Sequence, residues 1–278
     1  MQCVFQRNWH LSLRLENEFL LADATYCGTD GEYSARLQVN PNTFIVLGAQ
    51  WEVYRTATGA INKIVDLPQM QGLEAYFNSG RALREALASL EDSFAAPLFA
   101  DAVRAVIQSE TFLYRERGYS STDNYQEYWD NSFRNTCRYY SNLDRVQCQW
   151  YEHVGSDYRP GNLFNRMKSQ FLYRTEAGYR LVGHLNDSFH GVASELELAK
   201  DGSTVLKARG DLLRAPDIVC HESVRYMDKL EGKLLGGLKK RNITELLGSS
   251  EGCVHLFEIV SDGMETVVLY KKTEEKKM

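Results

Sequence analysis

The chain has 278 residues, of which 44% are apolar and 25% charged, with a net charge of −5 and a pI of about 5.8. A chain of this size and composition buries a core without disulfides, and its negative charge argues against nucleic acid or anionic membranes as partners. The first ten residues lack the apolar run of a signal peptide, and no stretch approaches the ~20 apolar residues of a membrane span. We therefore expect a cytoplasmic protein without membrane partners, whose six cysteines are free thiols or ligands.

The first part of the chain predicts antiparallel strands followed by helices. Phe19 to Ala24 and Ser34 to Val39 alternate apolar and polar residues, as half-buried strands do. Asn40-Pro-Asn42 is typical of a hairpin turn. A helix is expected from about Pro97 to Tyr114.

Glu110 lies on the apolar face of that expected helix. A buried carboxylate there would be a candidate acid or base. The other interpretation is an ion pair with Arg115 or another arginine of residues 115–145. We favour the ion pair, because a charge is seldom buried without a partner.

Residues 119–164 are rich in aromatic and arginine side chains. Tyr125, Trp129, Phe133 and Cys137 recur every four residues, which predicts one helix from about Asn124 to Tyr140. This segment is either core between helices, which we favour, or a site where a protein partner or a planar anionic small molecule binds by stacking and cation–π contact.

A second set of strands resembles the first at an offset of about 160 residues. Tyr179 to His184, Ser194 to Leu198 and Thr204 to Lys207 again alternate, and Lys200-Asp-Gly202 occupies the place of the first turn. The helical likeness pairs Gly80 with Gly232 and continues into Ile259 to Tyr270. The alternative is that any two alternating strands look similar.

We therefore predict an α+β protein of two related modules, residues 1–118 and 165–278, each an antiparallel sheet followed by helices. The aromatic-rich segment 119–164 joins them as a helical connector. Residues 271–278 are expected to be a disordered tail.

The C-terminal module carries the candidate chemistry. Asp217 is expected to cap a helix that contains Cys220, and Ser250 to cap one that contains Cys253 and His255; a further helix is expected between Leu235 and Gly248. Thiolate and imidazole are ligands that soft and borderline metals prefer, and a helix start favours the thiolate.

Further ligands are expected from the connection between two strands, Asn186-Asp187-Ser-Phe-His190. The candidate metal ligands are therefore Cys220, Cys253, His190, Asp187 and His255. The first module has no cysteine at the matching places, so we expect one site per chain. The alternative is that Cys220 and Cys253 are ordinary small core residues.

Residues 165–278 resemble an uncharacterised bacterial family of unknown function that carries a Gly-Cys-Thr-His-Leu signature, here Gly252-Cys-Val-His-Leu256. The order of elements is also similar to iron–sulfur scaffold proteins of the IscU and NifU type. That resemblance implies zinc or a nascent cluster on Cys220 and on Cys253 with His255. The chain departs from that pattern because the Asp187 loop has no cysteine, so a mixed Cys/His/Asp site fits better.

Our expectation is a metal-binding or sulfur-handling protein that holds zinc, iron or an iron–sulfur cluster, and the sequence leaves open whether it is an enzyme. One alternative is an enzyme with a pocket between the modules, in which Cys253 is the nucleophile or a metal ligand and Glu110 or His190 the base. The other is an interaction protein whose cysteines only pack. No nucleotide cofactor is expected, because the glycine-rich phosphate-binding motifs are absent.

Overall fold

The computed structural model describes residues 1–235 and 238–275. Residues 236–237, within the helix expected after Leu235, and residues 276–278 of the expected tail lie outside the described residues.

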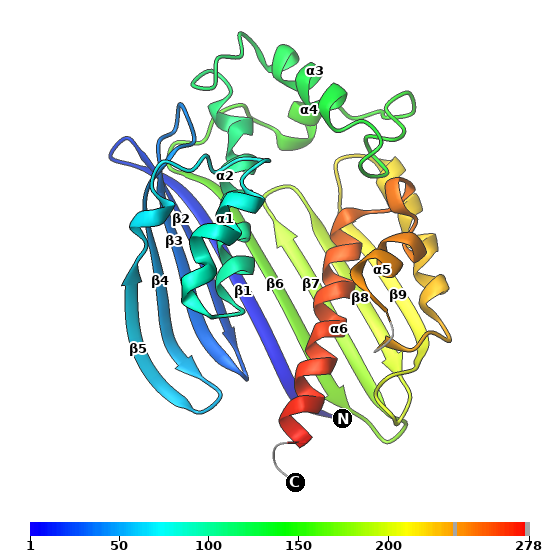
Figure 1. Cartoon of the computed structure of the whole chain (residues 1–278). Helices are drawn as coiled ribbons and strands as arrows, with labels where there is room; N and C mark the ends of the chain where they lie inside the picture. Colours follow the sequence, from blue (N-terminus) through cyan, green and yellow to red (C-terminus); the bar gives the residue numbers. More distant parts are fainter. Residues whose placement is uncertain (236–237, 276–278) are drawn as a thin grey trace. The chain divides into compact units, whose positions relative to one another are not determined.

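The chain is a mixed α+β protein, as predicted (Figure 1). Within residues 1–235 and 238–275, nine strands are hydrogen-bonded in the order β5-β4-β3-β2-β1-β6-β7-β8-β9. Their bounds are β1 Gln2–Glu16, β2 Phe19–Gly28, β3 Gly31–Val39, β4 Val46–Thr56, β5 Gly59–Asp66, β6 Asn162–Arg174, β7 Tyr179–Asp187, β8 Gly191–Leu198 and β9 Val205–Arg214.

Two compact units divide the chain, and each is described by itself. One comprises residues 8–125 and 156–167, and the other residues 1–7, 126–155 and 168–278. Most of the expected connector thus folds with the C-terminal strands.

In the unit of residues 8–125, alternating strands bury one face under a helix. The helices are α1 (Gly80–Leu87) and α2 (Ala95–Leu113), with short 3₁₀ turns η1 (Pro68–Met70) and η2 (Ala88–Leu90). Helix α2 packs on β2 and β3, and its buried residues include Phe99, Val103 and Val106 (Figure 1). Strand β5 lies at the edge and is almost wholly exposed.

Glu110 lies fully buried in α2 and is paired, as we favoured from the sequence. Its Oε1 accepts from Nε of Arg117 at 2.9 Å, and its Oε2 accepts from the Tyr76 hydroxyl at 2.7 Å. The Arg117 guanidinium also stacks over the Phe44 ring, 4.1 Å from its centroid. These contacts give Glu110 a structural role.

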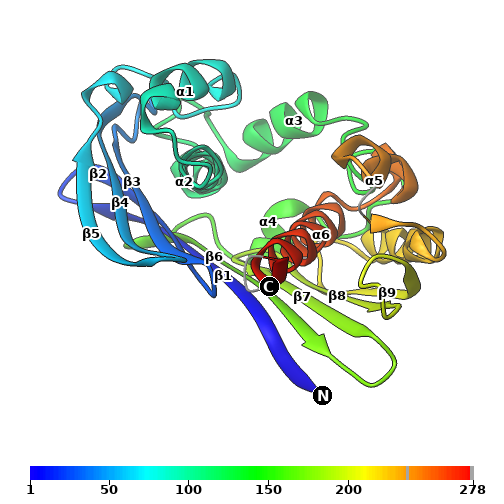
Figure 2. The same cartoon turned by 60° about the horizontal axis from the view of Figure 1, so that its bottom comes forward.

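In the other unit, helices cover one face of β7, β8 and β9. They are the 3₁₀ helix η3 (Ile218–Leu230), α5 (Lys240–Leu246), the short turn η5 (Ser249–Glu251) and α6 (Val254–Glu275). Helix α6 packs on β7 and β8, and both cartoon views show it along these strands (Figure 2). The connector adds α4 (Trp150–Val154) and most of α3 (Thr122–Ser132).

The expected cap of η3 is present. The Asp217 side chain accepts from the backbone N–H of Val219 at 2.8 Å, and also from those of Gln147 and Cys148 at 2.8 and 2.9 Å. Burial alone would raise the pKa of Asp217, but these three donors lower it. Asp217 therefore joins the connector to the start of η3.

Three local predictions were wrong. Helix α3 ends at Ser132 and not near Tyr140, because Asn135 adopts a left-handed conformation (φ 63°) that no helix accommodates. Ser250 lies in η5 and does not cap α6; Cys253 directly precedes that helix and accepts its first bond from Phe257 N–H at 3.0 Å. Residues Lys271–Glu275 are not a disordered tail but continue α6.

Similar backbone bonds recur in the two units. Val46 donates to Leu73 O and accepts from Gly72 N–H, while Val205 donates to Lys233 O and accepts from Gly232 N–H, all at 2.8–3.0 Å. Gly72 and Gly232 both have positive φ, 82° and 75°. By its hydrogen bonds, Gly232 occupies the place in its unit that Gly72 occupies in the other. The sequence pattern instead paired Gly232 with Gly80.

Candidate metal centre

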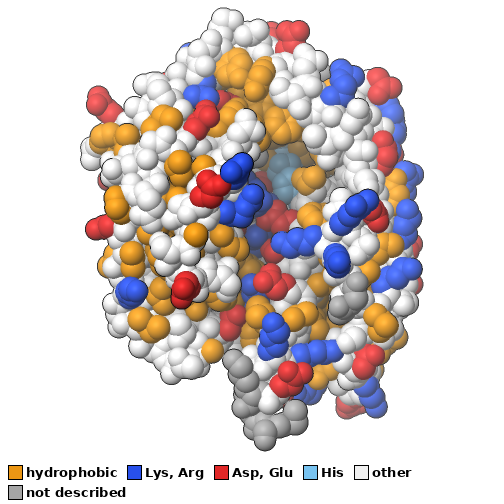
Figure 3. Space-filling model, viewed as in Figure 1, with side chains coloured by type: hydrophobic (Ala, Val, Ile, Leu, Met, Phe, Trp, Pro, Cys, Tyr) orange, Lys and Arg blue, Asp and Glu red, His pale blue; other side chains and the backbone are white. Residues whose placement is uncertain are grey.

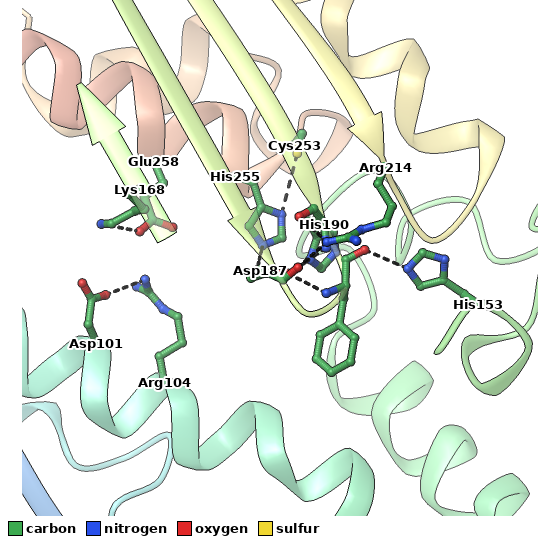
Figure 4. A network of polar contacts seen from close by, with 11 residues as sticks. Asp101, Arg104, His153, Lys168, Asp187, His190, Arg214, Cys253, His255 and Glu258 are labelled. Carbon is green, nitrogen blue, oxygen red and sulfur yellow. Dashed lines mark hydrogen bonds and ion pairs between the residues drawn. The ribbon is translucent and has the colours of Figure 1, made fainter. Parts of the chain in front are cut away.

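The loop between β7 and β8 is organised by the carboxylate of Asp187. Its Oδ1 accepts from the backbone N–H groups of Phe189 and His190 at 2.8 and 2.7 Å, and lies 3.1 Å from Nδ1 of His190 (Figure 4). The Asp187 side chain is only 4% exposed. One carboxylate oxygen thus fixes both its own loop and the imidazole at the loop's end.

Arg214, at the end of β9, holds the same loop from the other side. Its guanidinium donates to the backbone carbonyl of Asp187 and, at 3.2 Å, to that of His190. These two carbonyls belong to the candidate ligands themselves, which are the first and last residues of the loop segment 187–190. Arg214 therefore limits the ways in which the loop can open.

Helix α6 brings His255 to the loop. Nε2 of His255 lies 3.9 Å from Oδ2 of Asp187, and the His190 and His255 ring centroids are 4.0 Å apart. One ligand atom from each of Asp187, His190 and His255 lies within 4.8 Å of the other two. With metal–ligand bonds of ~2.0–2.1 Å, neighbouring ligands of a tetrahedral ion lie roughly 3.3 Å apart, so small side-chain adjustments suffice to bind one.

The group is partly accessible. The His190 and His255 side chains are 15% and 18% exposed, and histidine atoms reach the surface on the face shown in Figure 3. On that face acidic and basic side chains are interspersed around them. A metal ion or a small ligand can thus approach the imidazoles.

Cys253 lies on the other side of the His255 ring. Its Sγ is 4.0 Å from Nδ1 of His255, whereas Asp187 faces Nε2 (Figure 4). Burial raises the pKa of the Cys253 thiol to about 11, although the N–H groups of Leu256 and His255 act in the opposite direction. Burial therefore outweighs the expected effect of the helix start, and the group is a thiol at neutral pH.

Cys220 is a core residue of η3. It is 8% exposed and packs in one cluster with Val219, Met227 and Leu230. Burial raises the pKa of its thiol to about 12. Neither Cys220 nor Cys253 belongs to the group of ligand atoms within 4.8 Å among the described residues, and the neighbouring His221 is exposed.

Gly252 has a steric reason to precede Cys253. A Cβ at this position would lie 1.9 Å from the backbone oxygen of Leu247, far inside contact distance. Only glycine lets the chain pass this carbonyl and present Cys253 and His255 at the start of α6.

Sequence reasoning missed Arg214 and two residues of α4. Nε2 of His153 lies 2.8 Å from the Phe189 carbonyl, and the Trp150 ring lies 4.9 Å from the Phe189 ring. Burial lowers the pKa of His153. The capping pair Gln149 and Glu152 signals a helix here, but nothing local indicates that this helix contacts the loop.

Part of the chain matches a known protein family. Residues 167–269 match a family described as "Protein of unknown function (DUF2889)". This range contains Asp187, His190 and His255, and agrees with the expected uncharacterised domain. No curated protein and no solved structure matches the chain. Among the described helices, none has the length and apolar character needed to span a bilayer.

Proposed function

We propose that the protein binds one divalent transition-metal ion through Asp187, His190 and His255. The observation that carries the proposal is the convergence of one carboxylate and two imidazoles within 4.8 Å of one another. Imidazole favours zinc, iron, copper and nickel over magnesium or calcium, which prefer oxygen ligands only. Zinc and iron are therefore the expected ions.

Three protein ligands leave coordination positions open. Closed structural zinc sites have four protein ligands, whereas sites that act on a substrate have three and keep one position for water or substrate. The partial exposure of both imidazoles supports access to such a position. The proposed ion thus serves ligand binding or activation more than stability.

Cys253 has two roles in the proposal, and they are distinguishable. When His255 binds metal through Nε2, its Nδ1 carries a proton that points to the Cys253 sulfur, which then fixes the ring as an outer partner. Alternatively Cys253, with Cys220, supplies thiolates for a sulfur-rich or iron–sulfur site. The first role is favoured because neither thiol belongs to the group of described ligand atoms that lie within 4.8 Å of one another.

Metal binding to the chelator-stripped, untagged full chain tests the proposal. Titration with Co²⁺ and competition with Zn²⁺ are expected to give one equivalent per chain. His190→Ala and His255→Ala should each lose more than the about 10- to 100-fold in affinity that outer partners contribute. His221→Ala is the control, since that exposed histidine lies outside the group.

The same titration separates the ligand sets. Loss of binding in the histidine variants with retention in Cys220→Ala and Cys253→Ala supports the Asp/His/His site. The reverse pattern, with sulfur-to-metal charge transfer in the Co²⁺ spectrum, supports the thiolate site. Absence of any bound metal, or equal behaviour of all variants, overturns the proposal.

The order of atoms around His255 favours one second candidate, an enzyme with Cys253 as nucleophile. The Cys253 thiol faces Nδ1 of His255, and the Asp187 carboxylate faces Nε2. In such an enzyme Cys253 would be the nucleophile, His255 the base, and Asp187 the carboxylate that orients the base. Selective alkylation of Cys253 near neutral pH, lost in His255→Ala, would support this candidate. The raised pKa of the thiol argues against it.

We also propose that the two modules arose by internal duplication. The expectation of one site per chain rests on this duplication, because the first module lacks the matching cysteines. The matched bonds of Val46 and Val205 support it. In the first module the residue directly before the long helix is Phe94, as Cys253 is in the second. Phe94 packs against Tyr26 and Tyr33, with ring centroids 4.8 and 4.3 Å away, so aromatic rings fill the corresponding region.

A further inference from the structure

Cys137 lies in a connector segment that is fixed along the approach to helix α6. The backbone N–H of Arg138 donates to the Gly252 carbonyl at 2.8 Å, and the Ser141 hydroxyl donates to the Ser250 carbonyl, also at 2.8 Å. The buried guanidinium of Arg138 additionally pairs with Glu251. Residues 137–141 are therefore held against residues 250–252.

This bond places Cys137 next to Cys253. Cys137 directly precedes the donor Arg138, and Cys253 directly follows the acceptor Gly252. This 2.8 Å bond and the peptide unit on each side of it keep the Cα atoms of Cys137 and Cys253 within roughly 8 Å of each other. Disulfides span Cα separations of roughly 4.4–6.8 Å.

The surroundings of the two thiols agree with this placement. Both side chains are partly buried and pack against the same hydrophobic cluster. Cys220 packs in this cluster as well, but it comes from η3.

We propose that Cys137 and Cys253 form a reversible disulfide whose formation weakens metal binding at Asp187, His190 and His255. With a peroxide as oxidant, the two S–H bonds and the O–O bond break. One S–S bond forms, and two water molecules leave with the thiol hydrogens, the sulfurs supplying both electrons. The regulatory part rests on the proposed metal site.

The link to the metal site runs through His255. In the dithiol form the Cys253 sulfur lies beside Nδ1 of His255. A bond to Cys137 turns this sulfur away and removes the partner that holds the ring with Nε2 toward Asp187. Loss of such an outer partner lowers metal affinity by about 10- to 100-fold.

Disulfide mapping tests the pair without reference to metal. The full-length chain with Cys3→Ser, Cys27→Ser and Cys148→Ser is reduced, treated with hydrogen peroxide or diamide, alkylated, digested and analysed by mass spectrometry. We expect a Cys137–Cys253 peptide that is absent in Cys137→Ser, persists in Cys220→Ser and disappears on reduction. A disulfide to Cys220 instead overturns the pair. Oxidation of Cys137 or Cys253 to sulfinic or sulfonic acid without any disulfide overturns it as well.

Co²⁺ titration of the reduced and oxidised forms then tests whether the disulfide weakens metal binding. At least tenfold weaker binding after oxidation, restored by dithiothreitol and absent in Cys137→Ser, is expected. Equal affinity of both forms overturns the regulatory part while the mapped disulfide stands. If the reduced chain binds no metal at all, the proposed function fails and the regulatory part with it, whereas the mapping still decides the pair.

Discussion

Nε2 of His255 lies 3.9 Å from Oδ2 of Asp187, although one residue starts a helix and the other ends a strand. The two elements meet because α6 packs directly on β7 and β8. The position of the α6 start therefore decides whether Asp187, His190 and His255 come together.

Gly252→Ala should displace the start of α6. The added Cβ meets the Leu247 carbonyl at 1.9 Å, and such overpacking costs about 1–3 kcal/mol or more of unfolding free energy. We expect a lower midpoint of thermal unfolding together with weaker Co²⁺ binding. Gly161→Ala is the matched control, since nothing lies within 4 Å of its Cβ; equal effects of both variants would refute the steric account.

Arg214→Met should loosen the loop that carries Asp187 and His190. The variant loses the donors to both loop carbonyls, so metal affinity is expected to fall by about 10- to 100-fold, with partial recovery in Arg214→Lys. Arg209→Met, at an exposed position of the same strand, is the control. Unchanged Co²⁺ affinity in Arg214→Met would show that the loop keeps its shape unaided.

Arg117→Met should destabilise the protein strongly. It leaves the fully buried Glu110 without its cation, a change that costs about 3–5 kcal/mol. Chemical denaturation measures this loss, and the double variant Glu110→Gln/Arg117→Met should recover part of it. Arg115→Met removes an exposed ion pair with Asp157 and a contact of the guanidinium with the Tyr114 ring, and the loss of the ion pair should cost about 0–1 kcal/mol.

Alkaline pH should destabilise the fold through its buried thiols. The folded pKa values are about 12 for Cys220 and about 11 for Cys253, against an ordinary value of 9.0. Since the unfolded chain loses these protons first, the stabilisation is complete below pH 9 and is lost as pH rises through the folded values. Between pH 8 and roughly pH 10.5, thermal midpoints should fall less in Cys220→Ala/Cys253→Ala; an equal fall would assign the effect to other groups.

Local patterns were sufficient for parts of β2, β3, β7, β8 and β9, for the two hairpin turns and for the Asp187 loop, whereas no strand was predicted over β1 or β6. Alternation with period two identifies half-buried strands wherever one sheet face is covered, and the short polar run at Asp187 and His190 lies where a connection is needed. The Asp217 cap was also predictable, because the capping bond reaches the backbone N–H of Val219, only two residues further along the chain.

The composition of the site was only partly predictable. Asp187, His190 and His255 were among the expected ligands and do converge, whereas Cys220 and Cys253 lie outside their group. A Cys-x-His spacing does not specify which ring nitrogen faces the sulfur, and that orientation is set by packing. Arg214, His153 and Cys137 reach this region only through contacts between distant segments.

The expected helix to Tyr140 shows a different limit. Trp129 and Phe133 do stack at 4.4 Å, as a four-residue spacing suggests, yet the left-handed Asn135 ends the regular structure before Cys137. The resulting turn brings the backbone N–H of Arg138 to the Gly252 carbonyl, a contact that a continuous helix would not make.

The two oxygens of Asp187 have separate duties. Oδ1 is saturated by its own loop, so the carboxylate keeps its orientation whatever stands beside Oδ2. An ion bound as proposed would therefore arrive or depart without any remodelling of the polypeptide around Asp187, which suits a centre that exchanges its cargo rather than one that depends on it for shape.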